Sequence, residues 1–169
     1  LRESRYGQRV INRLLVDGTA SSGLFAADIE ADIPGADLAA GARIRPFGGV
    51  PSYEVRGRAA LLDLAQLLPG TVRRESFAGD FAIVGEGTSF KTFDGTVAID
   101  LDQAILPART RTFVLGTSEL DGTLRNGVLD FDADISLAGD GGRAVGSGSI
   151  DLVARPIPLT VRAARAEHL

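Results

Sequence analysis

Three aspartates at alternate positions form the densest group of side chains that could do chemistry. Asp130, Asp132 and Asp134 invite comparison with the calcium loop of an EF-hand, which needs glycine at its sixth position and glutamate at its twelfth. Counted from Asp130, those positions hold Ile135 and Gly141. Carboxylates spaced two apart on a strand instead share one solvated face. We therefore predict a wet carboxylate ladder and no metal site.

Catalytic groups of other kinds are scarce. His168 is the only histidine and lies next to the last residue, and cysteine is absent. A serine or cysteine nucleophile needs a base beside it, and a thiolate metal site needs cysteines. The segment Gly146–Ile150 (GSGSI) does not have the pattern of a nucleophile elbow. The sequence predicts no catalytic residue, no cofactor and no enzymatic activity.

The charge balance argues against two classes of partner. The chain carries 18 basic and 22 acidic residues, with a formal net charge of −4. Nucleic acids and anionic membrane surfaces bind basic patches, so neither is an expected partner. No apolar run approaches the roughly 20 residues of a membrane span. Because the first residue is Leu1 and not methionine, we interpret the chain as a segment of a longer protein, with membrane anchoring outside this segment.

A period of two runs through the chain and predicts β-strands with one apolar and one wet face. It is clearest in residues 128–137, where Leu129, Phe131 and Ile135 alternate with the three aspartates. The same alternation places these further residues on the apolar side: Phe25, Ile29 and Ile33; Leu38 to Ile44; Tyr53 and Val55; Phe77, Phe81 and Ile83; Phe93, Val97, Ile99 and Leu101; Ile150 and Leu152; Ile157, Leu159 and Val161. No long helices alternate with the strands, so the predicted class is all-β and antiparallel.

Three segments depart from this alternation. Residues 61–68 place Leu61, Leu64 and Leu68 at helical spacing, and Pro69 follows, so we predict a short helix that covers an open end of the sheet. Residues 1–17 fit either a strand or a short helix. Residues 165–169 form a tail without a clear pattern, which leaves residues 18–164 as the predicted domain.

Small residues are frequent on the predicted apolar side. They include Gly57, Gly79 and Gly95. Gly79 and Gly95 share the form Phe-x-Gly-x-apolar, and each removes a side chain from the apolar side, which is expected to bend the sheet or to leave room for a ligand. Two arrangements fit the pattern: a sandwich of two sheets closed on each other, and one long folded sheet whose apolar interior stays open as a groove. A dry core usually needs larger side chains, which favours the groove without excluding the sandwich.

The texture and order of the motifs resemble the C-terminal repeats of the TamB (translocation and assembly module) family and of related AsmA-like envelope proteins. The resembling pieces are LLDLAQLLPG at 61–70, FAGDF at 77–81, FDGTVAI at 93–99, LDGTL at 120–124, GSIDL at 148–152 and PIPL at 156–159. Together they cover roughly residues 18–164. That family has no catalytic residues to carry over to this chain.

The resemblance implies a β-taco, a long antiparallel sheet folded lengthwise around a hydrophobic groove. It also implies a large periplasmic protein in the envelope of a Gram-negative-type bacterium, anchored in the inner membrane and reaching toward the outer one. Such proteins are implicated in moving phospholipid between the membranes and in assembling outer-membrane proteins with a barrel partner. Acyl chains in an apolar trough avoid water, at about 0.8 kcal/mol per buried methylene.

We therefore expect phospholipid or other acyl chains as ligands, and a barrel protein of the outer membrane as a partner. The residues expected to line the groove are Phe25, Ile29, Ile33, Phe77, Phe81, Ile83, Val97, Ile99, Leu101, Leu129, Phe131, Ile135, Ile150 and Leu152. Two alternatives remain open. One is a module that binds nascent outer-membrane strands at a sheet edge by β-augmentation. The other is a ligand-free structural β-sandwich of a cell-surface protein.

Overall fold

The computed structural model describes residues 2–6, 9–33, 35–61, 76–107, 112–138, 142–153 and 159–168. These residues form twelve strands and one turn of 3-10 helix, η1 (Phe90–Thr92). The strands are β1 (Arg2–Tyr6), β2 (Arg9–Ser21), β3 (Leu24–Ile33), β4 (Ala36–Arg45), β5 (Ser52–Leu61), β6 (Ser76–Glu86), β7 (Asp94–Pro107), β8 (Thr112–Leu115), β9 (Ser118–Arg125), β10 (Val128–Ser136), β11 (Gly142–Asp151) and β12 (Leu159–His168).

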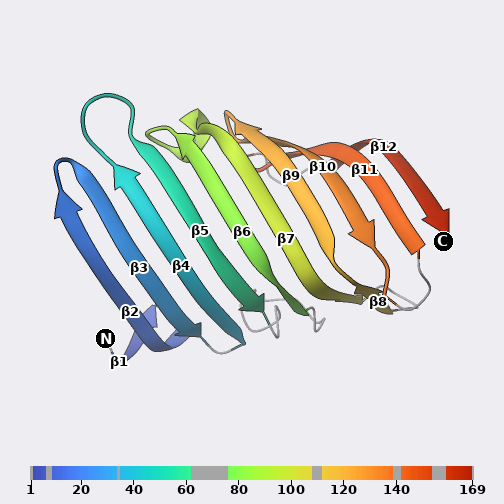
Figure 1. Ribbon diagram of the computed structural model, residues 1–169, viewed down its shortest axis with the longest axis horizontal. Helices are drawn as coiled ribbons and strands as arrows, with labels where there is room; N and C mark the ends of the chain where they lie inside the picture. The colour runs from blue at the N-terminus through green and yellow to red at the C-terminus, as the bar shows by residue number, and fades with distance from the viewer. Residues whose placement is uncertain are drawn as a thin grey trace.

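All of these strands belong to one antiparallel sheet. Its order is β1-β2-β3-β4-β5-β6-β7-β9-β10-β11-β12, and β8 pairs with the far end of β7, beyond β9. The strands lie side by side in a single layer, with β1 and β12 at opposite ends, so the sheet does not close into a barrel (Figure 1). The predicted all-β antiparallel class is confirmed. The alternative of a closed sandwich is wrong for the described residues, because they contain no second sheet to pack against the first.

The strand register brings the alternating patterns into phase. Residues directly opposite each other in neighbouring strands point to the same side of a sheet. Phe81 pairs with Ile99, Ile83 pairs with Val97, and Phe131 lies two strands away from Val97 in the same row. We define the apolar face as the side that carries these side chains: Leu14, Val16, Phe25, Ala27, Ile29, Ala31, Leu38, Ala40, Ala42, Ile44, Tyr53, Val55, Ala59, Phe77, Phe81, Ile83, Val97, Ile99, Leu101, Leu120, Leu124, Leu129, Phe131, Ala133, Ile135 and Ile150.

Most side chains of the apolar face are half-buried, and no second layer of described residues lies over it. Among the described residues the buried hydrophobic ones are Ala36, Ala42, Ala104, Leu115 and Leu124, and no large side chain is fully buried. The chain exposes 11576 Å², whereas a compact globular protein of 17.7 kDa exposes about 8,000 Å². This excess is what an open single layer produces, because a sheet normally buries its apolar face against a second layer.

Several glycines on the apolar face lie under side chains of neighbouring strands. A Cβ atom at Gly148 would lie 2.8 Å from the ring of Phe131, and one at Gly122 would lie 2.7 Å from Cδ1 of Leu129. A Cβ atom at Gly85 would lie 2.5 Å from the ring of Phe93. At these three positions the space left by the missing side chain is filled by the side chain of a neighbouring residue.

Substitution of Gly57 should test how closely the strands approach each other. A Cβ atom there would lie 2.4 Å from the carbonyl oxygen of Ala39 and 2.7 Å from Cβ of Ala40. We expect Gly57→Ala to destabilise the sheet by about 1–3 kcal/mol, because backbone atoms cannot move away as a side chain can. Gly41→Ala is the matched control, since its nearest atom is Oδ1 of Asp28 at 3.5 Å. Chemical denaturation that gives both variants the same stability would contradict this reason for the glycine.

The ends of the predicted domain lie within strands. Of the two alternatives for residues 1–17, the structure contains strands, because β2 runs through residue 17 to Ser21. At the other end β12 continues to His168, through the tail for which no pattern was predicted. Leu61, the predicted start of the short helix, is the last residue of β5, and residues 62–68 lie outside the described residues. In the described part of the chain, no helix has the length and apolar character needed to cross a membrane.

Candidate functional site

The residues predicted from sequence to line a groove gather on the apolar face. Phe25, Ile29, Phe77, Phe81, Ile83, Val97, Ile99, Leu101, Leu129, Phe131, Ile135 and Ile150 all lie on it, by the register of β3, β6, β7, β10 and β11. Ile33 is the last residue of β3 and pairs with Ala36. Leu152 follows the end of β11, and its backbone N–H donates to the carbonyl oxygen of Gly127 at 2.9 Å.

The bulkiest part of the face lies over β6, β7, β9 and β10. One row across the strands contains Phe81, Ile99, Leu120 and Ala133, each directly opposite the next. Leu120 and Leu124 belong to the site although they were not among the predicted lining residues. The signal was present in the sequence, because both leucines alternate with polar residues in the segment 120–124.

The apolar face offers almost no hydrogen-bonding groups. Among the described residues between Leu14 of β2 and Ile150 of β11, the face carries no charged residue. Its polar side chains there are Tyr53 and Ser118, and Ser118 is 3% exposed. The Ser118 hydroxyl donates to the carbonyl oxygen of Gly116 at 3.0 Å and accepts from the backbone N–H of Ser136 at 3.2 Å. Its hydrogen-bonding capacity is therefore used within the sheet. What the face can do is remove apolar surface of a ligand from water.

Part of the face is directly open to solvent. Phe25 is 51% exposed and Val16 is 58% exposed, and they lie on the neighbouring strands β3 and β2. Around Tyr53 the surface is aromatic, because the ring of Phe93 lies 6.3 Å from the Tyr53 ring, measured between centroids. Phe93 was predicted as a strand residue, but it precedes β7, and its ring lies over Gly85 and Gly95.

The opposite side of the sheet, the polar face, carries cross-strand ion pairs. Arg13 of β2 contacts Glu30 of β3 at 3.3 Å, and Arg125 of β9 contacts Asp94 of β7 at 3.4 Å. Pairs this exposed contribute little to stability, with a typical value below about 1 kcal/mol. They do fix which side of the sheet faces water, and charges on an outer surface oppose association of sheets.

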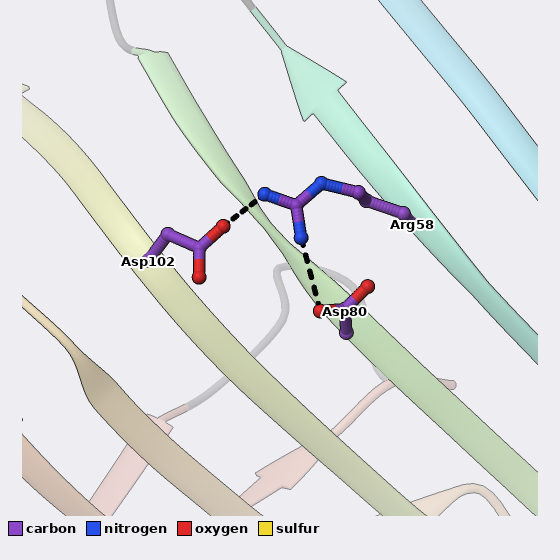
Figure 2. A network of polar contacts seen from close by, with 3 residues as sticks. All are labelled: Arg58, Asp80 and Asp102. Carbon is purple, nitrogen blue, oxygen red and sulfur yellow. Dashed lines mark hydrogen bonds and ion pairs between the residues drawn. The ribbon is translucent and has the colours of Figure 1, made fainter.

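Two β-bulges send a charged side chain across a strand to a partner on the next strand but one. The pairing register of β6 and β7 shifts at Gly79, and Asp102 of β7 contacts Arg58 of β5 near this shift. Arg58 also donates a hydrogen bond to Asp80 of β6 at 3.0 Å (Figure 2). On β12 the register slips at Arg162, which contacts Asp130 of β10. Such bulges re-aim side chains. The hydrogen bond and negative charge of Asp102, with a contribution from Asp80, raise the pKa of Arg58 above its usual value.

The three aspartates behave as the predicted ladder. They lie on the polar face, where Asp130 contacts Arg162 and Asp134 accepts a hydrogen bond from Nε of Arg143 at 2.7 Å. Within the ranges that the structure describes, no group of histidine, cysteine, aspartate and glutamate residues is arranged to hold a metal ion.

Acid should weaken the ion pair between Asp134 and Arg143, and titration of the Asp134 carboxyl measures this effect. The hydrogen bonds from Arg143, together with its positive charge, hold the pKa of Asp134 below its usual value against a smaller opposing effect of burial. Because this pKa is lower in the folded than in the unfolded state, the contribution to stability is present above the unfolded pKa. It is lost as the pH falls through the folded pKa. We expect Arg143→Gln to raise the pKa of Asp134 toward its ordinary value in a carboxyl NMR titration. An unchanged titration would show that Arg143 is not the cause.

The fold and the site together define a class: an open, single-layer antiparallel β-sheet with one uncharged, uncovered face and one ion-paired face. The chain matches no protein-family model, no curated protein and no solved structure. The TamB and AsmA-like resemblance therefore rests on the sequence motifs.

Proposed function

We propose that the apolar face binds acyl chains of phospholipid, and that the chain is one segment of a hydrophobic path along which lipid moves across a cell envelope. The observation that carries this proposal is the uncharged apolar face itself, which spans β2 to β11 and has no second layer over it in the described residues.

The chemistry of the face favours an acyl chain over a polypeptide as its cover. A polypeptide brings backbone N–H and C=O groups, which need partners when they are buried. Among the described residues the face supplies only the hydroxyls of Tyr53 and Ser118 as side-chain partners, and that of Ser118 is already bonded within the sheet. An acyl chain has no polar groups along its length, so it gains from burial without leaving anything unsatisfied.

The strand order supports a path longer than this chain. β1 and β12 lie at opposite ends of the layer, so each leaves an edge to which a further strand can pair. This agrees with the β-taco that the TamB and AsmA-like resemblance implies, in a periplasmic protein of a Gram-negative-type envelope anchored in the inner membrane. In that setting the face would carry phospholipid between membranes and support outer-membrane protein assembly. We propose no catalytic step.

Lipid extraction from the purified protein tests the proposal. The protein is purified from bacterial cells without detergent. Lipid is then extracted from the purified protein and analysed by mass spectrometry. We expect co-purified phospholipid, and we expect its amount to fall when Ile99 is replaced by a charged residue. A folded protein free of lipid, which also takes up none from added vesicles, would refute the proposal.

A second function, capture of an extended peptide by β-augmentation, is favoured by β12. This strand is ten residues long and is outermost in the described sheet. Outer strands present backbone groups to which another strand can pair. A peptide that pairs there should crosslink to β12 positions and leave lipid binding unchanged, whereas the lipid proposal places ligand contacts on β6, β7 and β10.

A further inference from the structure

The loop between β4 and β5 is an exposed apolar element unrelated to the apolar face. It comprises residues 46–51, Pro-Phe-Gly-Gly-Val-Pro, and has no charged residue. Phe47 is 78% exposed and Val50 is 58% exposed. The loop rises well above the turn between β2 and β3 beside it (Figure 1). Its base is attached to the sheet, because the backbone N–H of Gly87 donates to the carbonyl oxygen of Pro51 at 2.9 Å.

A hollow of about 720 Å³ adjoins this loop at the same end of the sheet. Ser52 and Val84 lie on the polar face within its lining, and Arg43, Arg45, Glu54 and Glu86 bring two positive and two negative charges. Only some of these four charges are paired with each other. Arg43 lies 3.8 Å from Glu54, whereas Arg45 and Glu86, both opposite Ser52 in the ladder, form no ion pair with any described residue.

These two features match different parts of a phospholipid bilayer. Aromatic and aliphatic side chains on an uncharged loop tip gain free energy by entering the boundary between headgroups and acyl chains. A guanidinium binds a phosphate, and a carboxylate pairs with an ammonium group. Two arginines and two glutamates therefore suit a zwitterionic headgroup, which carries one positive and one negative charge. The net charge of −4 opposes binding to an anionic surface.

We propose that the β4–β5 end of the sheet docks on bilayers of zwitterionic phospholipid. Phe47 and Val50 enter the interface, and Arg45 and Glu86 hold a phosphate and an ammonium group of one headgroup. This goes beyond the acyl-binding function, since it uses a loop and the polar face. It therefore stands or fails independently of lipid on the apolar face.

The absence of tryptophan from the chain permits a direct test. The variant Phe47→Trp carries a single tryptophan and is mixed with vesicles of phosphatidylethanolamine and phosphatidylcholine whose acyl chains are brominated. We expect a blue shift of its emission and quenching by the bromine atoms. Unshifted and unquenched emission would overturn the proposal.

Two further single-tryptophan variants establish the orientation. Val145→Trp is the control at a half-exposed position on the polar face of β11, where Val145 is 45% exposed, and it should remain unquenched. Phe131→Trp reports on the apolar face. Quenching of Val145→Trp without that of Phe47→Trp would show that the protein meets the bilayer by another surface, and would overturn the proposal. Quenching of Phe131→Trp alone would show acyl chains on the apolar face without docking of the loop, and would overturn it as well.

Charge variants test the headgroup contact. We expect Arg45→Glu to weaken vesicle binding about tenfold in a flotation assay, since a charge-assisted phosphate contact is lost. The double variant Arg45→Glu with Glu86→Arg keeps one charge of each sign and should recover most of the binding. Unchanged binding by Arg45→Glu, or stronger wild-type binding to phosphatidylglycerol vesicles than to zwitterionic ones, would contradict a zwitterionic site.

Discussion

Replacement of Ile99 by arginine should leave the sheet folded and strongly weaken acyl binding. Ile99 lies on the apolar face between Phe81 and Leu120 of the neighbouring strands. No second layer covers it, so the arginine stem can lie along the face while its guanidinium reaches water. We expect a loss of stability of no more than about 1–2 kcal/mol. We expect at least about tenfold weaker lipid binding, because an acyl chain laid over the face would remove water from the guanidinium.

The measurement combines a circular-dichroism melt with uptake of a fluorescent phospholipid. Thr96→Arg is the matched control, since Thr96 is an exposed residue on the polar face of the same strand. It should bind lipid like the wild-type protein. An Ile99→Arg variant that fails to fold would indicate that the face is sealed, and one that binds lipid normally would remove Ile99 from the path. Ile99 is preferred to Phe131, whose ring also lies over Gly148.

Replacement of Leu115 by aspartate should have the opposite effect and unfold the sheet locally or entirely. Leu115 is 7% exposed, and it lies between Ala104, which is 3% exposed, and Leu137. This is one of the few places where a large side chain is buried. A carboxylate there has no described cation beside it, so we expect a loss of about 3–5 kcal/mol in chemical denaturation.

The control for this variant is Leu115→Met, which keeps the volume and apolar character and should cost less than about 1.5 kcal/mol. The informative quantity is the difference between the stability lost in Leu115→Asp and the stability lost in Ile99→Arg. Both changes place a charge on the apolar side of the sheet, but only Leu115 is buried by neighbouring strands. Equal losses at the two positions would mean that the face is covered at Ile99 as well.

The apolar face could be predicted from sequence because a period of two needs no tertiary information. Every strand that alternates strictly, such as residues 128–136, presents the same side to its neighbours once the turns set the register. The carboxylate ladder followed from the same rule. The choice between one open sheet and a closed sandwich could not follow from it, because alternation states which residues avoid water and not what covers them.

Features that depend on contacts between distant strands were not predicted. The slip beside Gly79 brings Asp102 to Arg58, and the only local sign was two successive polar residues, Asp102 and Gln103. The register shift at Arg162 was harder to recognise from sequence. The alanines that follow it fit either face of a strand, so the alternation of apolar and polar residues does not show where it changes. The contact between Phe93 and Gly85 was not predicted either, because the Phe93 ring, just before β7, packs over a residue of the neighbouring strand β6.

The central claim, that acyl chains lie on the apolar face, is tested most directly by photo-crosslinking from single positions on the two faces. A photoreactive residue is placed at Phe81, Ile99 or Leu129 on the apolar face, and at Ala82 or Ala98 on the polar face of the same strands. After incubation with phospholipid vesicles and irradiation, mass spectrometry identifies the adducts. We predict lipid adducts at the three apolar positions and none at the two polar ones. Adducts of equal yield on both faces, or none on the apolar face of a folded protein, would contradict the claim.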